Sequence, residues 1–406
     1  LDGLVPQAIP FVVKFFAAKA WYVVLARVIL INVVLGAISK KLAKRNDGLP
    51  PINITIRGTV EPRRLVFGTR RVGGVLAWYG VSSVSPGSSS TQDYLWYVIV
   101  LAGHQVADIR DHWVDTERIA DSDVDGSTAE VTGKFAGKLK IWRHLGEGAQ
   151  TVNTDLDTAI TDWTSDHRLQ GCAYVVVRFQ RDDGLFPGIP QNFTSLVDGA
   201  LCYDQRLDST NGGSGSHRAE DPSTWEFSRN PALILQWYLT GGSVVNDQSS
   251  RMVRYGLREP YSKVVSTFVV AAANECDETL TGGNAPPSGD QTRYYCDLEV
   301  SCAEPRRDIV NAILATMAGT AAMVHGKWRV YAGAYDTPVH TLDENDLHGD
   351  LEIQDTVSHS ERYNAVSAVF VDSTKEYTED TCKMRTDSAY ETQDGSEQIL
   401  RELDLR

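Results

Sequence analysis

Most of this chain alternates between apolar and polar positions or carries short continuous apolar runs, and both patterns are typical of β-strands. Alternation places successive side chains on opposite faces of a strand, so that one face can be buried. Short continuous runs indicate strands that are buried on both faces. The strands predicted in this way cover residues 52–56, 64–67, 73–79, 94–101, 138–142, 174–179, 327–331 and 365–371. The chain is therefore expected to be mainly β.

Helical patterns are fewer and gather mainly after residue 230, which predicts α+β parts and a helix-containing middle domain. Asn230 is a good N-cap, and Pro231 suits the first helical position because its missing N–H would have no partner there anyway. The apolar face of this helix is expected to carry Leu233, Ile234, Trp237 and Tyr238. Further helices are predicted over residues 155–163, 261–273 and 306–318.

The segment from Ile9 to Ile38 is nearly all apolar and predicts one long N-terminal hydrophobic helix. Lys14, Lys19 and Arg27 interrupt it, but at about 100° per residue these charges do not share a face, so the helix is apolar nearly all round. Such a helix must bury its surface against copies of itself or against neighbours. The residues expected to pack in this way, or to meet a membrane, are Phe15, Phe16, Trp21, Val24, Leu25 and Ile31.

Three interpretations of this helix remain open: a membrane anchor, a helix buried among copies in an oligomer, and a helix stored in a particle that later enters a membrane. The longest stretch without a charge, residues 28–39, is shorter than the ~18 residues of a clean membrane span. No small-residue cleavage site precedes the basic run at 40–45, so a signal peptide fits poorly. Burial among copies is favoured. A need for detergent during purification would instead support the anchor.

The predicted domains follow these changes of pattern. Residues 1–48 form the hydrophobic helix and a linker, and residues 49–205 form a first β-rich domain. Residues 206–230 form a polar loop, expected to be mobile because of its Gly- and Ser-rich stretch. Residues 231–345 form an α+β domain, and residues 346–406 form a second β segment that is expected to continue beyond residue 406.

Composition narrows the class of protein only a little. Apolar residues make up 42% and charged residues 23%, as in folded proteins generally. The net charge of −14 argues against a dedicated nucleic-acid binder, which needs a basic face for phosphates. None of the six cysteines lies in a CxxC pair, so zinc-ribbon and thioredoxin-type sites are excluded. Cys172 and Cys202 lie in apolar runs and are interpreted as small buried hydrophobes.

Candidate metal and phosphate sites fail at required positions. Asp121–Gly126 resembles the first half of a calcium loop, but Thr132 stands where a bidentate Glu should close the cage. An acidic turn between strands is the preferred interpretation. At Gly326–Lys327 the Walker spacing fails, and Trp328 replaces the required Ser or Thr. Cofactor and metal sites are therefore not predicted.

Signals for catalysis are also weak, so the chain is not expected to be an enzyme. GxSxG and HExxH motifs are both missing from the sequence. A basic cluster is interpreted as a solvated or salt-bridged face rather than a DNA contact; it comprises Arg63, Arg64, Arg70 and Arg71. One group of acids and histidines could support acid–base or metal chemistry, although a solvated loop is the simpler interpretation. Its members are His340, Asp343, Glu344, Asp346, His348, Asp350 and His359.

An ordered series of segments across residues 49 to 400 carries a resemblance to a known family. The segments are Pro62–Gly68 (PRRLVFG), Arg143–Gly146 (RHLG), Trp163–Tyr174 (WTSDHRLQGCAY), Phe186–Pro190 (FPGIP), Ser228–Leu235 (SRNPALIL), Ala272–Glu278 (AANECDE), Gly326–Trp328 (GKW) and Asp394–Gly395 (DG). Each is unspecific alone, but in this order they resemble the tip attachment protein, or central tail hub, of long-tailed bacteriophages, the family of host-specificity protein J.

The resemblance implies a homotrimer whose β domains form a ring that continues the tail tube. The implied partners are distal tail and tail tube proteins, the tape measure protein, tail fibre proteins and a host cell-surface receptor. DNA would pass through the ring without tight binding, and the host membrane is a further expected contact of the N-terminal helix. The implied location is the tail tip of the virion, after assembly in host cytoplasm, where the cysteines would stay reduced.

Two other classes of function remain open. A membrane-anchored cell-surface binding protein would use the segment from Ile9 to Ile38 as its anchor. A cell-wall hydrolase is the third alternative, and zymography on peptidoglycan separates it from the other two.

Overall fold

The computed structural model describes residues 61–83, 93–186, 190, 192–246, 251–281, 291–334 and 362–404. The protein forms two compact units, divided between Ala332 and Gly333. The predicted strand at 52–56 and the predicted N-terminal helix lie outside the described residues. The part that is described is mainly β with helices, as predicted.

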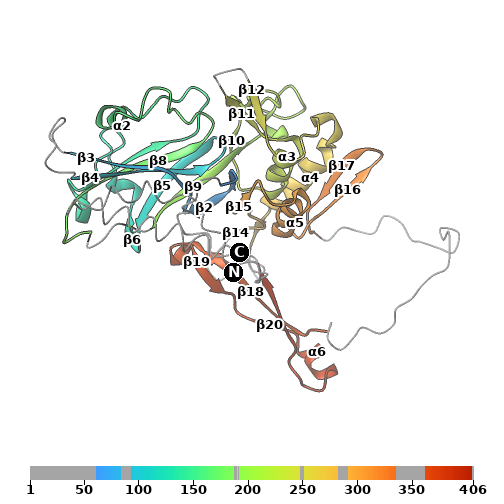
Figure 1. Ribbon diagram of the computed structural model, residues 1–406. Coiled ribbons are helices and arrows are strands. Elements are labelled where there is room, and N and C mark those ends of the chain that lie inside the picture. Colours follow the sequence, from blue (N-terminus) through green and yellow to red (C-terminus); the bar gives the residue numbers. More distant parts are fainter. Residues whose placement is uncertain are drawn as a thin grey trace, which may run out of the picture. The chain divides into compact units, whose positions relative to one another are not determined.

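A four-stranded antiparallel sheet forms one layer of the first unit (Figure 1). In spatial order its strands are β3 (Val75–Ser82), β4 (Tyr94–Ala102), β8 (Ala173–Gln180) and β7 (Leu139–His144). A five-stranded sheet contains β10 (Glu226–Phe227), β9 (Phe193–Cys202), β5 (Val106–Val114) and β6 (Glu117–Ile119), with β2 (Thr69–Val72) also paired to β9. All these pairings are antiparallel, so one face of each strand carries alternate residues.

Both faces of the four-stranded sheet are buried. In β4, Leu95 and Ile99 belong to a core cluster that also contains Ile109 of β5 and Val197 of β9, so this face packs on the five-stranded sheet. The alternate residues of β4, among them Trp96, enter a second cluster on the other face. The helix α2 (Thr154–Ala159) covers that face through buried Leu156. Burial on two sides explains why β4 has a continuous apolar sequence.

Three helices and two two-stranded sheets build much of the remainder of the first unit around a separate core. The elements are α3 (Pro231–Thr240), α4 (Ser266–Asp277), α5 (Arg306–Thr316), the hairpin of β16 (Thr320–Val324) and β17 (Lys327–Tyr331), and the pair of β1 (Arg64–Phe67) with β15 (Leu298–Ser301). Asn230 caps α3, because its side-chain oxygen accepts from the backbone N–H groups of Ala232 and Leu233. All of α3 is buried rather than one face only, since α4, α5 and β9 all contact it.

The predicted helix over residues 261–273 is divided in two. A 3₁₀ turn, η7 (Tyr261–Lys263), precedes α4, and Val264 and Val265 between them are extended. The break has a physical cause: Val264 forms a parallel bridge with Trp328, and the N–H of Val265 donates to the Trp328 carbonyl at 2.9 Å. Pairing with β17 therefore replaces one helical turn. The helix predicted over residues 155–163 is also shorter, because Ile160 is extended.

The remaining elements of the first unit are short. They are η3 (Asp121–Asp123), η4 (Gly133–Phe135), η5 (Gln205–Leu207), η6 (Pro222–Thr224), β11 (Ser243–Asn246), β12 (Arg251–Arg254), β13 (Thr279–Leu280) and β14 (Gln291–Thr292). The segment 206–230, predicted as a mobile loop, has defined turns and internal hydrogen bonds, while its mobility stays a prediction.

The second unit is a small sheet around β18 (Ala365–Asp372). Its other elements are η11 (Ser373–Lys375), β19 (Thr378–Thr381), β20 (Arg385–Thr386), α6 (Ser388–Gln393) and β21 (Leu400–Asp404). Strands β19 and β20 are antiparallel to β18, and β21 is parallel to it. The side chain of Asn364 connects the start of β18 to the segment that leads into β21. Its amide donates to Asp394 at 3.0 Å and accepts from the N–H of Ile399 at 2.8 Å.

None of the described helices combines the length and the hydropathy that a membrane span requires.

Replacing Gly68 with Ala tests the connection between β1 and β2. Gly68 has φ +61, and an added Cβ would lie 2.1 Å from the carbonyl oxygen of Cys296. Gly133→Ala is the matched control, because Gly133 has φ +67 and nothing within 4 Å. The left-handed backbone alone costs about 1–2 kcal/mol. We expect about that loss for Gly133→Ala and roughly 3 kcal/mol or more for Gly68→Ala in denaturant unfolding, because the clash adds to it. Equal losses in the two variants would contradict this packing.

Candidate functional site

The residues singled out for oligomer or membrane contact lie outside the described part of the chain. These are Phe15, Phe16, Trp21, Val24, Leu25 and Ile31. The group of acids and histidines from His340 to His359 lies outside it as well. Their roles stay predictions. The residues that are described contain no group of three or more His, Cys, Asp or Glu side chains placed to hold a metal ion.

The acidic segment 121–126 forms a turn, as preferred from the sequence. Asp125 accepts hydrogen bonds from the backbone N–H groups of Ser127 and Thr128, both at 2.8 Å. Hydrogen bonds from the hydroxyl and N–H of Ser127 and from Thr128 hold the pKa of Asp125 well below its usual value. Asp121 forms an ion pair with Arg143 at 2.5 Å. These carboxylates are therefore engaged within the turn and its neighbouring strand.

The basic cluster is more deeply placed than predicted. Arg64 forms an ion pair with buried Glu299, as the salt-bridged alternative proposed. The solvated alternative is wrong for Arg70 and Arg71, since both residues are buried. Arg71 donates to the Thr194 hydroxyl at 2.9 Å, and its guanidinium lies 4.1 Å from the centre of the Trp113 ring. Arg70 and Arg71 are thus part of the interior, whereas Arg64 is half-buried and Arg63 is exposed.

A polar junction connects the sheets to the helical part of the first unit. Its members are Arg63, Arg64, Thr69, His104, Arg229, Tyr255, Asp297 and Glu299. Asp297 accepts from the backbone N–H of Thr69 at 2.8 Å and from the Arg229 guanidinium at 2.9 Å. Arg63 donates to the Tyr255 hydroxyl at 2.8 Å, which in turn donates to the Gly103 carbonyl. Segments that are far apart in sequence meet here.

His104 is the buried imidazole of the junction. Its Nε2 accepts from the backbone N–H of Val66 at 3.0 Å, which fixes a tautomer with the proton on Nδ1 facing the Gln105 carbonyl at 2.7 Å. Burial lowers the pKa of His104 to about 4. The ring is therefore neutral and acts as a structural acceptor.

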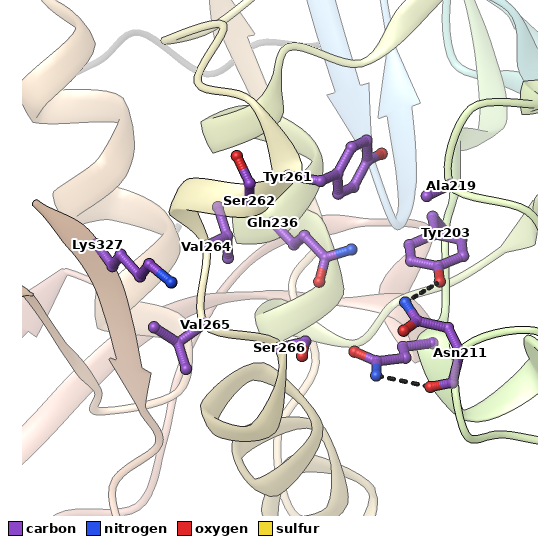
Figure 2. Close-up of a pocket in the computed structure, with 11 residues that line it drawn as sticks. Tyr203, Asn211, Ala219, Gln236, Tyr261, Ser262, Val264, Val265, Ser266 and Lys327 are labelled. Carbon is purple, nitrogen blue, oxygen red and sulfur yellow. Dashed lines mark hydrogen bonds between the residues drawn. The ribbon is translucent and has the colours of Figure 1, made fainter.

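A pocket of about 360 Å³ lies beside the start of α4 (Figure 2). It is lined by Tyr203, Gln205, Asn211, Ala219, Gln236, Tyr261, Ser262, Val264, Val265, Ser266 and Lys327. The side chains come from four parts of the sequence: the turns after β9, the helix α3, the segment from η7 into α4, and the first residue of β17. A second hollow adjoins it, since Gln205 and Asn211 line both.

Hydrogen bonds hold the turns after β9 in place as one wall of the pocket. Tyr203 donates to Asp208 at 2.8 Å and accepts from the Asn211 amide at 3.3 Å. Gln205 donates to the Asn211 carbonyl at 2.9 Å. Arg206 is held by Asp204, at 2.7 Å. The wall is therefore preformed.

The groups that line the pocket are suited to binding a ligand. Burial, with the hydrogen bond to Asp208 adding to it, raises the pKa of Tyr203 to about 12, and burial raises the pKa of Tyr261 as well. Both phenols are therefore neutral near pH 7 and cannot act as bases. The eleven lining residues contain no carboxylate, imidazole or thiol. Hydroxyls, amides and one lysine remain, which suit recognition rather than acid–base catalysis.

Sequence reasoning missed this pocket. The sequence predicts only a polar loop for its wall and an apolar helix for the segment that contains Gln236. The amide of Gln236 in a mostly apolar helix is the available signal, because a buried amide needs partners.

Comparisons with known proteins give little guidance. No protein-family model matches the sequence, and no curated protein matches it. A solved chain from the virion of a native gene transfer agent particle has a similar arrangement, with a TM-score of 0.47 and 14% sequence identity. The match covers 89% of this chain and 72% of that chain. A likeness of this degree assigns neither a family nor a function.

The low pKa of His104 predicts a loss of stability in acid. In the unfolded chain the imidazole of His104 has a pKa of about 6.5, whereas in the folded protein its pKa is about 4. Between these two pH values, the unfolded state therefore binds a proton that the folded state does not. The free energy of unfolding should therefore fall as the pH drops from 6.5 to 4, by about 3 kcal/mol from this residue. His104→Gln keeps an acceptor for Val66 and should remove that part of the pH dependence in denaturant unfolding. The exposed His325→Gln is the control, and equal pH profiles for both variants would refute the assignment.

Proposed function

We propose that this protein is the structural tail-tip hub of a siphophage-like virion. In this role it closes the tail tube, connects the tube to distal tail and tail fibre proteins, and forms the DNA exit channel at infection. The observation that carries the proposal is the ordered series of segments from Pro62–Gly68 to Asp394–Gly395, which resembles the central tail hub family.

The placement of those segments supports the proposal. Pro62–Gly68 supplies β1 and the tight turn against Cys296, and Ser228–Leu235 supplies Arg229 and the N-cap of α3. Asn274 of Ala272–Glu278 accepts from Arg206 at 3.0 Å beside the pocket, and Asp394 binds Asn364 in the second unit. These segments therefore lie where distant parts of the chain meet. Proteins that share a fold are expected to resemble each other at such positions.

The assembly that we propose is a homotrimer, with a ring of β domains around a lumen. Its partners are the tail tube and distal tail proteins, the tape measure protein, the tail fibre proteins and a host cell-surface receptor. The hydrophobic segment from Ile9 to Ile38 packs between copies, and contact with the host membrane is part of the same proposal. The protein is structural and not an enzyme, and it is assembled in the host cytoplasm.

Localisation in the particle tests the role itself. Antibodies against the second unit, detected by electron microscopy, should label purified particles at the tail tip. Particles assembled without this protein should lack the tip. Label on the cell envelope of uninfected cells would instead support the alternative, a membrane-anchored cell-surface binding protein. Clearing of peptidoglycan in zymograms would favour a hydrolase.

Weak DNA binding is a second expected property. The protein has 53 acidic and 39 basic residues, and Arg70 and Arg71 of its basic cluster are buried. Each neutralised phosphate would add affinity and slow the passage of DNA. A filter-binding or anisotropy assay at physiological salt should therefore give a dissociation constant above about 1 µM, in the range of non-specific binding. Tighter binding than that would contradict passage through the lumen.

A further inference from the structure

The start of α4 has backbone donors without partners. Its N-cap is Val265, which has no side-chain acceptor, and the first turn contains no acidic residue. The N–H of Phe268 donates to the Val265 carbonyl at 3.1 Å. The N–H groups of Ser266 and Thr267 make no hydrogen bond within the described residues. Such groups, together with the helix dipole, favour an anion at this end of a twelve-residue helix.

An independent observation points into the same space. Gln236 is only 4% exposed, yet its side-chain amide forms no hydrogen bond with any residue that the structure describes. Figure 2 shows this amide projecting into the pocket among Tyr203, Tyr261 and Ser266. The amide atoms of Gln236 are not enclosed by protein, so that a ligand or solvent in the pocket completes their hydrogen bonding. The amide and the uncapped helix therefore face one binding position.

Charge selects the kind of anion. Lys327 lines the pocket, and its ammonium forms no ion pair with a described residue. The lining contains no Asp or Glu, while Arg206 of the adjoining hollow is already held by Asp204 and Asp277. One lysine and one helix N-terminus balance a single negative charge rather than the two of a phosphate.

The side chains that line the pocket indicate which kind of molecule carries the anionic group. Tyr203, Tyr261 and Val264 present apolar surface next to the donors, and the adjoining hollow gives an extended peptide room to continue. We propose that this pocket binds a carboxylate, from an Asp or Glu side chain or from the C-terminal residue, presented by an extended segment of a partner polypeptide. The inference rests on the pocket alone and holds whether or not the protein is a virion hub.

Titration with a matched pair of small probes tests the proposal. Acetyl-glutamate-methylamide carries the carboxylate, and acetyl-glutamine-methylamide is its neutral isostere. Amide resonances of Ser266 and Thr267, followed by NMR on the full-length protein, should shift and saturate with the first probe. The affinity of the neutral probe should be lower by about tenfold or more, because this probe loses the charge-assisted hydrogen bonds. Equal affinity for both probes would overturn the proposal. Tighter binding of inorganic phosphate would assign the site to a free phosphate and overturn it as well.

Variants connect the binding to the named groups. Lys327→Met and Gln236→Met should each weaken the glutamate probe severalfold. Lys263→Met is the matched control, since Lys263 precedes α4 but does not line the pocket and is paired with Glu259. If Gln236→Met does not fold, Lys327→Met decides alone, because that side chain is exposed. Unchanged affinity in Lys327→Met would contradict the proposal.

A carboxylate introduced into the protein itself tests the same position by its effect on stability. Ser266→Asp places a carboxylate at the first position of α4, where it should raise the melting temperature and abolish binding of the glutamate probe. Ser266→Asn is its neutral control and should retain probe binding. A melting temperature that is no higher in Ser266→Asp than in Ser266→Asn would show that the start of α4 does not attract an anion.

Discussion

Asp297 connects three segments that are more than sixty residues apart from one another in the sequence. Its carboxylate accepts from the N–H of Thr69 and from the guanidinium of Arg229, while the turn at Gly68 lies directly against the preceding Cys296 carbonyl. A buried or half-buried carboxylate is tolerated only with such partners, so that each contact requires the others. The sheets and the helical core meet at this position, and the partly buried ion pair of Arg64 with Glu299 lies on the adjoining strands β1 and β15. The pocket beside α4 depends on this junction, because α3, which lines the pocket through Gln236, begins directly after Arg229.

An element of this fold can be predicted from the sequence when the interactions that determine it lie among neighbouring residues. The strands were predictable because alternation and continuous apolar runs report which faces are buried, and β4 shows both faces covered. The N-cap at Asn230 was predictable because a cap needs only neighbouring residues. The break at Val264 was not, since it depends on Trp328, and the burial of Arg70 and Arg71 depends on β9 and β5. The pocket could not be predicted for the same reason: its wall, its donors and its lysine come from separate parts of the sequence.

Some of the segments that carry the family resemblance also contain residues that connect distant parts of the fold. Gly68, Arg229 and Asn274 are examples, each engaged with a distant part of the sequence. The resemblance is therefore a statement about architecture, and the proposal of a hub follows from architecture rather than from a catalytic group. The carboxylate pocket adds a place where such an architecture can engage another polypeptide.

Three-fold assembly is the central claim, since it would bury the surface of the segment from Ile9 to Ile38 and create the lumen. Its most direct test is the mass of the purified 406-residue chain in solution, combined with the symmetry of averaged images of the particle tip. We expect a mass three times that of the 44.7 kDa protomer and a three-fold axis along the tail. A stable, folded monomer in the intact particle would contradict it.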